Sequence, residues 1–252
     1  MNELPVLSQL AVLLVRPGVV VALAPTFGGL YATSRTKIGL TVLLAIGLLP
    51  SVAVPPAINA TELVGFIARE MAIGLALGLT VRALVGGVEF AGHLSANQMG
   101  LTYAGTIDPS SGAKHTVVTA MFNMLAVLTL FAIDGHHTIL RALAASYTGL
   151  PIGSGSVNAS LLNAVRDTFA LVFVTGVRLS APIVVVLLIV EVVIGFVSRV
   201  TPALSFMVIG YPVRMIVGLF VLGLVVVAVP GVVSSLSDRT IRLALETAGA
   251  FR

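Results

Sequence analysis

Long runs of apolar residues, separated by short polar interruptions, dominate the chain, and each run predicts a helix. A helix rises about 1.5 Å per residue, so a run of about 20 apolar residues is long enough to cross the hydrocarbon core of a membrane. Such runs cover, approximately, residues 6–28, 38–49, 62–90, 117–133, 161–198 and 204–233. The pattern therefore predicts an all-α membrane protein with about six hydrophobic helical segments.

Charged residues interrupt the third run, which starts at Thr61 and Glu62 and ends at about Phe90. This run is roughly 43 Å long at about 1.5 Å per residue, which exceeds a hydrocarbon core of about 30 Å. Ionisable side chains at membrane depth normally face protein or water, so we expect this segment to lie inside an assembly. Its charges are Arg69, Glu70, Arg82 and Glu89, and the GxxxG spacing of Gly74 and Gly78 allows another helix to approach closely.

Polar stretches separate or end the apolar runs. Residues 91–115, AGHLSANQMGLTYAGTIDPSSGAKH, contain Gly, Ser, Asn and an Asp-Pro pair, which favour turns, so we expect a long loop there. Asp134 is expected to cap an amphipathic helix over residues 136–147, and Gly, Ser and Pro in residues 148–160 predict a linker. From residue 238 onwards the sequence predicts a short polar helix or a frayed tail.

Composition narrows the class of protein. Hydrophobic residues make up 58% of the 252 residues and charged residues only 10%, which excludes an ordinary soluble domain. The absence of cysteine excludes disulfides, thiol catalysis and cysteine-ligated metals. The net charge of +4 comes without a basic run, so nucleic acid is not an expected partner.

Candidate chemistry is sparse along this chain. The sequence has no Walker A, GxSxG or HExxH motif and no pair of carboxylates in a shared polar loop, so neither an enzyme nor a cofactor is expected. Asp134, His136 and His137 invite a metal interpretation, but adjacent helical residues point about 100° apart. Capping and hydrogen bonding are therefore favoured over a metal site at these residues.

Three sequence elements, in order and at comparable separations, carry a resemblance that covers nearly the whole chain. They are a QMGL element, a DGHH element, and an SRxxP element followed by GxP. With them the chain resembles the FliR family of flagellar export-gate proteins, which belongs to the type III secretion export apparatus. The positions that carry the resemblance are Gln98, Met99, Gly100, Leu101, Asp134, Gly135, His136, His137, Ser198, Arg199, Pro202, Gly210 and Pro212.

The resemblance implies a single helical export-gate domain over residues 1–252, with a FliP-like four-helix part in residues 1–160 and a FliQ-like helical hairpin and tail in residues 161–252. It implies a non-enzymatic subunit that forms, with FliP-like and FliQ-like partners, the channel through which unfolded flagellar proteins cross the membrane. FlhB-like and FlhA-like export proteins are the implied neighbours. The implied location is the bacterial inner membrane, in contact with lipid, at the flagellar basal body.

The resemblance also implies that residues 103–115 form a plug that closes the channel. The small side chains of this stretch suit a segment that moves aside, while a plain surface connection is the alternative. Beside the stretch lie Met99, Met121 and Met124, which are interpreted either as a soft seal or, with more weight, as core packing. The plug residues are Tyr103, Gly105, Asp108, Pro109, Ser110, Ser111 and Gly112.

Glu191 and Arg214 are charges inside the last two apolar runs. Measured from a turn near Val200, they lie about 14 Å and about 20 Å along their antiparallel helices, a difference that an Arg side chain can span. We expect them to pair with each other, or each with a charge on a neighbouring subunit. The alternative is that one of them reaches to water.

A stand-alone secondary transporter for a small solute is the alternative function. Such a transporter would build its midplane site from broken helices, for which Pro17, Pro182 and Pro212 are the candidate breaks. Purification as a small homo-oligomer would favour the transporter, and purification with FliP-like and FliQ-like chains would favour the export gate.

Overall fold

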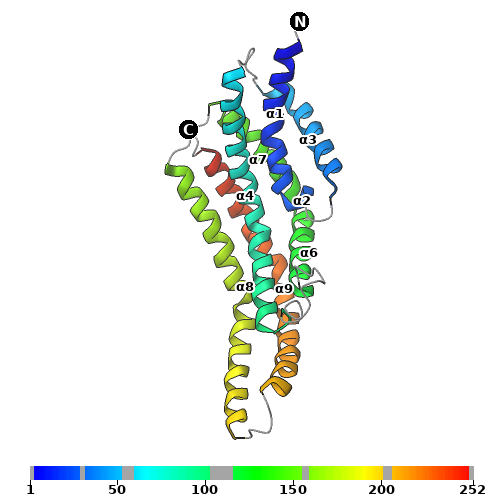
Figure 1. The fold of residues 1–252 in the computed structure, drawn as a ribbon, viewed down its shortest axis with the longest axis vertical. Helices are drawn as coiled ribbons and strands as arrows, with labels where there is room; N and C mark the ends of the chain where they lie inside the picture. Colours follow the sequence, from blue (N-terminus) through cyan, green and yellow to red (C-terminus); the bar gives the residue numbers. More distant parts are fainter. Residues whose placement is uncertain are drawn as a thin grey trace. The chain divides into compact units, whose positions relative to one another are not determined.

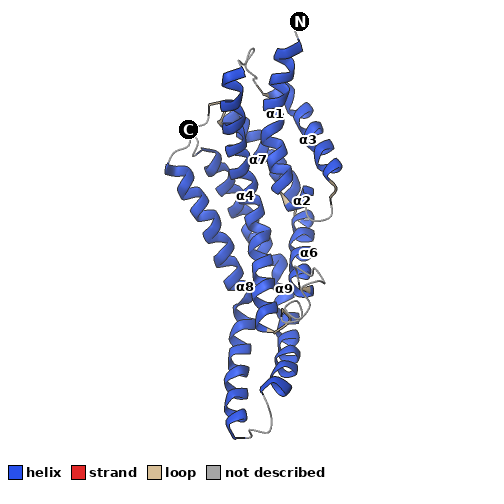
Figure 2. Cartoon of the chain, viewed as in Figure 1, coloured by secondary structure: helices blue, strands red, loops and turns tan. Residues whose placement is uncertain are grey.

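The computed structural model describes residues 3–28, 32–52, 60–102, 116–154, 159–200 and 206–249. Within these ranges every regular element is a helix (Figure 2). The predicted all-α fold class is therefore confirmed. In chain order (Figure 1) the elements are α1 (Glu3–Leu23), α2 (Pro25–Gly28), α3 (Ser34–Leu48), the short 3-10 helix η1 (Leu49–Ser51), α4 (Ala60–Gln98), α6 (Val117–Ala132), α7 (Gly135–Gly149), α8 (Ala159–Val200) and α9 (Phe206–Gly249).

The number of membrane-crossing helices differs from the prediction of about six. In the described part of the chain, three helices are long and apolar enough to cross, and α6 with α7, bent by 71°, adds a fourth if that pair counts as one span. Helix α3 has only 15 residues, whereas α4, α8 and α9 have 39, 42 and 44 residues. The three candidate spans are Glu62–Gln98, Val165–Val200 and Gly210–Ser237.

Contacts divide the chain into two compact units. Helices α4, α6, α8 and α9 each contribute one part to unit 1 and another part to unit 2. This division depends on contacts between residues and does not test the boundary near residue 160 that the resemblance implies. That boundary stays a prediction. Unit 1 comprises Met1–Leu84, Leu130–Ala170 and Ser235–Arg252, and unit 2 comprises Val85–Thr129 and Leu171–Ser234.

In unit 1, helix α1 packs through a single stripe. Its buried positions recur at 12 and 13, at 16 and 17, and at 20 and 21, which is the spacing of one helix face. Leu13 of this stripe shares a core cluster with Ile73 and Leu77 of α4 and with Leu143 of α7. The first apolar run of the sequence thus becomes one buried face, and Arg16 occupies a position within it.

In unit 2, four helices contribute fully buried apolar side chains. Val88 of α4, Phe122 of α6, Ile183 of α8 and Val229 of α9 are each 0% exposed. The parts of α8 and α9 on either side of residues 201–205 run as an antiparallel hairpin (Figure 1).

Residues 91–98 are helical, so the prediction of a loop beginning at residue 91 was wrong for this stretch. The Gly and Ser that suggested a turn serve close packing instead. A Cβ at Gly92 would lie 3.0 Å from the Cα of Thr119 and 3.0 Å from the Cβ of Phe122. Ser95 is buried and satisfies its hydroxyl by donating to the carbonyl of Ala91 at 2.7 Å. The Gly and Ser of residues 91–98 are therefore explained by the need for small side chains at a close helix contact.

The end of the chain also differs from its prediction. Helix α9 continues to Gly249 without a break, so the expected separate polar helix is a continuation of the last apolar run. Ser237 and Thr240 are buried there, which shows that this polar turn packs within unit 1.

Large apolar side chains remain exposed on several helices. Helix α3 buries only Ala45, while Ile38, Leu43 and Ile46 are 63%, 66% and 59% exposed. In the most apolar window of α8 only 17% of the residues are buried. Contiguous exposed apolar surface of this kind marks contact with lipid or with other protein chains.

Candidate functional site

An ion pair fully enclosed in unit 1 joins α1 to α4. The guanidinium of Arg16 donates from Nε to Oε2 of Glu70 at 2.8 Å and from Nη2 to Oε1 at 3.0 Å. Both side chains are 0% exposed. Two parallel N–H···O bonds fix the relative orientation of the two groups as well as their distance.

Neutral groups from α7 and the residues after it complete the shell around Arg16. Its Nη1 donates to the hydroxyl of Ser146 at 3.0 Å, and its Nη2 donates to the carbonyl of Leu150 at 3.2 Å. The Tyr147 ring lies under the guanidinium, with 4.1 Å between Cζ and the ring centroid. A buried charge is tolerated when it is paired and hydrogen-bonded, and this site meets both conditions.

The glycines of the GxxxG spacing allow α1 to approach α4 at this ion pair. A Cβ on Gly74 would lie 3.1 Å from the carbonyl oxygen of Arg16 and 3.0 Å from the Cβ of Val19. A Cβ on Gly78 would lie 2.8 Å from Cδ1 of Leu23. Close packing was the expected role of this spacing, and it is confirmed here. Gly74 follows Glu70 by one helical turn, so the close approach brings Arg16 within reach of its carboxylate.

Gly153 extends the same cluster toward its edge. Its N–H donates to Oε1 of Glu70 at 3.3 Å, and its carbonyl accepts from Nη1 of Arg69 at 2.6 Å. The φ of Gly153 is 80°, a left-handed conformation that favours glycine. The consecutive charges Arg69 and Glu70 therefore bind the same turn after α7 from two sides.

A second ion pair lies in the α8–α9 hairpin of unit 2. Nη2 of Arg214 donates to Oε1 of Glu191 at 3.0 Å, and the two side chains are 13% and 32% exposed. The pairing expected from the helix register is confirmed. Nε2 of Gln98, at the end of α4, lies 3.5 Å from the same carboxylate oxygen.

The remaining charges of the third apolar run are half-buried. Glu89 accepts a hydrogen bond from Nδ2 of Asn123 on α6 at 3.3 Å. Arg82 is also half-buried and interacts with its surroundings. These charges thus interact with groups of the chain itself, and the expectation that the segment lies inside an assembly stays a prediction.

The DGHH element forms the sharp bend between α6 and α7. Asp134 has a φ of 54°, and a Cβ on Gly135 would lie 2.7 Å from Cδ2 of Leu130, so the bend requires a small residue at 135. The predicted capping by Asp134 was wrong, because its side chain makes no cap hydrogen bond. Its Oδ1 instead lies 3.2 Å from Nδ1 of His137. The left-handed backbone turns this carboxylate towards the histidine and away from the helix end.

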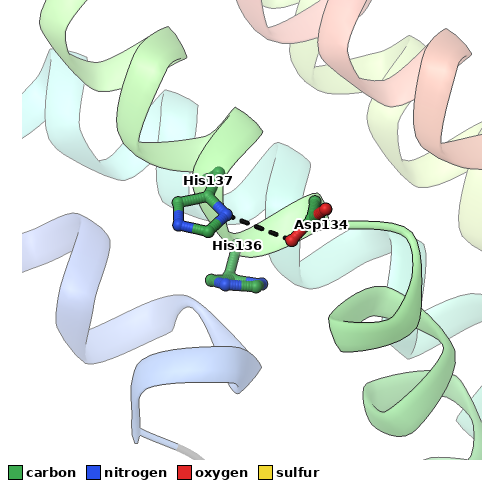
Figure 3. A group of neighbouring side chains, drawn as sticks. All are labelled: Asp134, His136 and His137. Carbon is green, nitrogen blue, oxygen red and sulfur yellow. Dashed lines mark hydrogen bonds and ion pairs between the residues drawn. The ribbon is translucent and has the colours of Figure 1, made fainter.

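The structure brings the donors of Asp134, His136 and His137 within 4.8 Å of one another. Figure 3 shows the contact between Asp134 and His137. The ring centroid of His137 lies 4.1 Å from that of the neighbouring His136. The His136 ring lies 5.1 Å from the Phe131 ring. The hydrogen bond between Asp134 and His137 and the ring contacts of His136 need no metal, and the expectation that no metal binds here stays a prediction.

The other family positions lie on α8 and α9 or outside the described residues. Arg199 is exposed at the end of α8, while Gly210 is buried and Pro212 exposed within α9. Pro202 and the predicted plug residues, Tyr103, Gly105, Asp108, Pro109, Ser110, Ser111 and Gly112, lie outside the described residues.

Sequence reasoning missed the part played by Arg16, an arginine inside the first apolar run. A signal was present, because an arginine inside an apolar helix needs an internal partner. Two carboxylates of the third run, Glu70 and Glu89, were the available partners in the next long segment. Choosing between them required knowledge of how α1 packs on α4.

Comparison with known proteins gives a consistent result. The family described as "Bacterial export proteins, family 1" matches residues 7–240. The flagellar biosynthetic protein FliR of Pectobacterium carotovorum subsp. carotovorum is 32% identical over 215 residues, which cover 83% of this chain and 81% of that protein. FliR of Escherichia coli (strain K12) is 30% identical over 211 residues, covering 82% and 79%. FliR of Bacillus subtilis (strain 168) is 27% identical over 202 residues, covering 79% and 78%.

Proposed function

The chain belongs to the bacterial export proteins of family 1, and from this membership we propose that it is a subunit of a flagellar type III protein export gate. The observation that carries the proposal is the similarity to flagellar biosynthetic proteins over about four fifths of both chains, for example 83% of this chain and 81% of its relative. A family of export components, rather than of enzymes, also agrees with the sparse catalytic chemistry of the sequence.

In this proposal the chain assembles with FliP-like and FliQ-like subunits into a channel in the bacterial inner membrane. Unfolded flagellar proteins pass through the channel, and FlhB-like and FlhA-like proteins are its neighbours at the basal body. The role of residues 103–115 as a plug stays a prediction, because they lie outside the described residues.

The exposed apolar helices support an assembly of this kind. Phe196 of α8 and Phe220 of α9 are 67% and 73% exposed, and Ile38 of α3 is 63% exposed. Lipid and partner subunits are the two surroundings that favour such surfaces. The interior charges of α4, α8 and α9 meet groups of the chain itself, so the exposed faces can remain apolar.

The transporter alternative loses its main structural motivation. Its site required helices broken at three prolines, but Pro17, Pro182 and Pro212 all lie inside continuous helices. We therefore retain the export-gate proposal alone.

Co-production with FliP-like and FliQ-like chains, followed by mass measurement of the intact complex, tests the proposal. We expect a stable hetero-oligomer containing this chain, and we expect the chain to restore swimming to a strain that lacks its own FliR. Gly65→Ala is a suitable control, because a Cβ at Gly65 meets nothing within 4 Å, and this variant should assemble and function like the wild type. A stable uncomplexed chain that moves a small solute across liposomes would overturn the proposal.

A further inference from the structure

The QMGL element, Gln98–Leu101, ends α4 with two characteristic backbone hydrogen bonds. The N–H of Gly100 donates to the carbonyl of Asn97 at 3.0 Å, and the N–H of Leu101 donates to the carbonyl of Ala96 at 3.0 Å. Gly100 has a φ of 80°. This is the Schellman pattern, in which a left-handed glycine ends a helix and satisfies its last carbonyls. The chain therefore leaves α4 at a fixed point and not from a frayed end.

Met99 anchors this helix end to α9. Its side chain is 1% exposed and lies directly against the backbone of Gly218. A Cβ at Gly218 would lie 2.6 Å from Cγ of Met99 and 3.2 Å from its Sδ. A larger residue at position 218 would collide with the Met99 side chain as it is placed here. The contact between Met99 and the space left by Gly218 is therefore specific. It also favours the core-packing interpretation of Met99 over the soft-seal one.

Gln98 adds a polar contact beside the apolar one. Its amide lies 3.5 Å from the Glu191 carboxylate that also binds Arg214. Arg214 and Gly218 are four residues apart, so they lie on one face of α9. The end of α4 thus meets the hairpin at an ion pair and, one turn further along α9, at a glycine gap. These residues and Met99 all belong to unit 2.

We propose that the QMGL element is an anchor that holds the end of α4, up to Thr102, in one position on the α8–α9 hairpin. Each residue has its own part. Gly100 and Leu101 stop the helix, Met99 fills the gap at Gly218, and Gln98 reaches the ion pair. Met99 is the main contact because it is buried, and Gln98 contributes less because its hydrogen bond is long. The consequence for export rests on the function proposed above.

Distance measurement between two spin labels tests the anchor directly. The chain has no cysteine, so labels can be placed at Thr102→Cys and Phe220→Cys without further changes. Measured on the full chain co-produced with its FliP-like and FliQ-like partners, the parent should give one narrow distance. Met99→Ala should lose this single distance and give a broader or second population. Met99→Leu, which refills the gap with a side chain of similar volume, should restore it.

Two glycines of α9 provide a matched comparison. Gly218→Leu should displace the end of α4, whereas Gly223→Leu, where a Cβ meets nothing within 4 Å, should leave the distance unchanged. If Gly218→Leu fails to accumulate, the Met99 pair still decides. A narrow, unshifted distance in Met99→Ala would overturn the anchor.

Export by the same variants separates positioning from folding. With equal amounts of assembled complex, Met99→Ala should export less flagellar protein than the parent, and Met99→Leu should recover export. Unchanged export in Met99→Ala despite a displaced helix end would overturn the positioning role. A parent chain that shows the narrow distance but never joins its partners would instead contradict the proposed function and leave the anchor standing.

Discussion

Arg16 with Glu70 in unit 1, and Glu191 with Arg214 in unit 2, are ion pairs of similar length and very different surroundings. Their shortest N···O distances are 2.8 Å and 3.0 Å. The first pair is 0% exposed on both sides, while the side chains of the second are 13% and 32% exposed. Distance alone would rank them as equals, and burial separates them.

The difference shows what each charge needs from the fold. Arg16 uses four N–H donors of the five a guanidinium offers, on Glu70, Ser146 and Leu150. Removing one partner of such an enclosed pair leaves the other charge buried and unpaired, which is far more costly than losing the pair as a whole. Glu191 and Arg214 keep some access to water or polar surroundings, so removing either one costs less free energy of unfolding. The stability of unit 1 therefore depends strongly on its ion pair, and the stability of unit 2 depends on its ion pair only weakly.

Breaking the buried pair should have the largest effect. Arg16→Met and Glu70→Met should each lower the free energy of unfolding by about 3–5 kcal/mol, because each strands one buried charge. The double variant should be less damaged than either single variant, since both charges are gone. The measurement is the temperature at which the detergent-solubilised complex loses its monodisperse peak in size-exclusion chromatography. A double variant worse than both single variants would show that the two charges act separately.

Closing the gap that admits Arg16 should have a smaller effect, comparable with that of removing a neutral partner of Arg16. Gly74→Ala places a methyl group 3.1 Å from the Arg16 carbonyl oxygen, which is backbone and cannot rotate away. Overpacking of this kind costs about 1–3 kcal/mol, less the roughly 0.5–1 kcal/mol that alanine gains over glycine in a helix. Gly65→Ala on the same helix meets nothing and should show only the gain. Equal heat stability of the two variants would mean that α1 and α4 pack less closely than described.

Removing a neutral partner of Arg16 should have a moderate effect. Ser146→Ala deletes the hydroxyl that accepts from Nη1 at 3.0 Å, in a site without access to water. An unsatisfied buried donor costs about 1–3 kcal/mol. The same heating assay should show a loss smaller than that of Arg16→Met. Thr148→Ala is the control, because Thr148 is exposed on the same helix and its hydroxyl only returns to the carbonyl of Ala145.

The sequence predicted one of these ion pairs and missed the other, for a reason that lies in chain connectivity. Glu191 and Arg214 lie on two helices that follow each other closely in the chain, so counting residues from the connection is enough to bring them together. Arg16 and Glu70 are 54 residues apart, and their meeting depends on α1 choosing α4 as its packing partner. Register is local information, whereas helix pairing is a property of the whole core.

The candidate site shows the same limit. The resemblance picked out Gln98, Met99 and Gly100, but it did not say what they do, because two of their partners, Glu191 and Gly218, lie on other helices. The helical state of residues 91–98 was missed because small residues are typical both of turns and of close helix contacts, and the sequence alone does not distinguish the two. The fold class followed from apolar periodicity, which needs no knowledge of pairing.

Exchanging the charges of the unit 2 pair should have the smallest effect and sharpens the contrast with unit 1. Glu191→Arg alone sets two cations side by side and should cost about 1 kcal/mol, because the site is partly exposed. With Arg214→Glu added, opposite charges face each other again, and the Gln98 amide can accept through its oxygen instead of donating. The double variant should therefore regain nearly all of the lost heat stability and of the export activity. Two inactive single variants with an equally inactive double variant would instead indicate that Glu191 or Arg214 serves a charge on a neighbouring subunit.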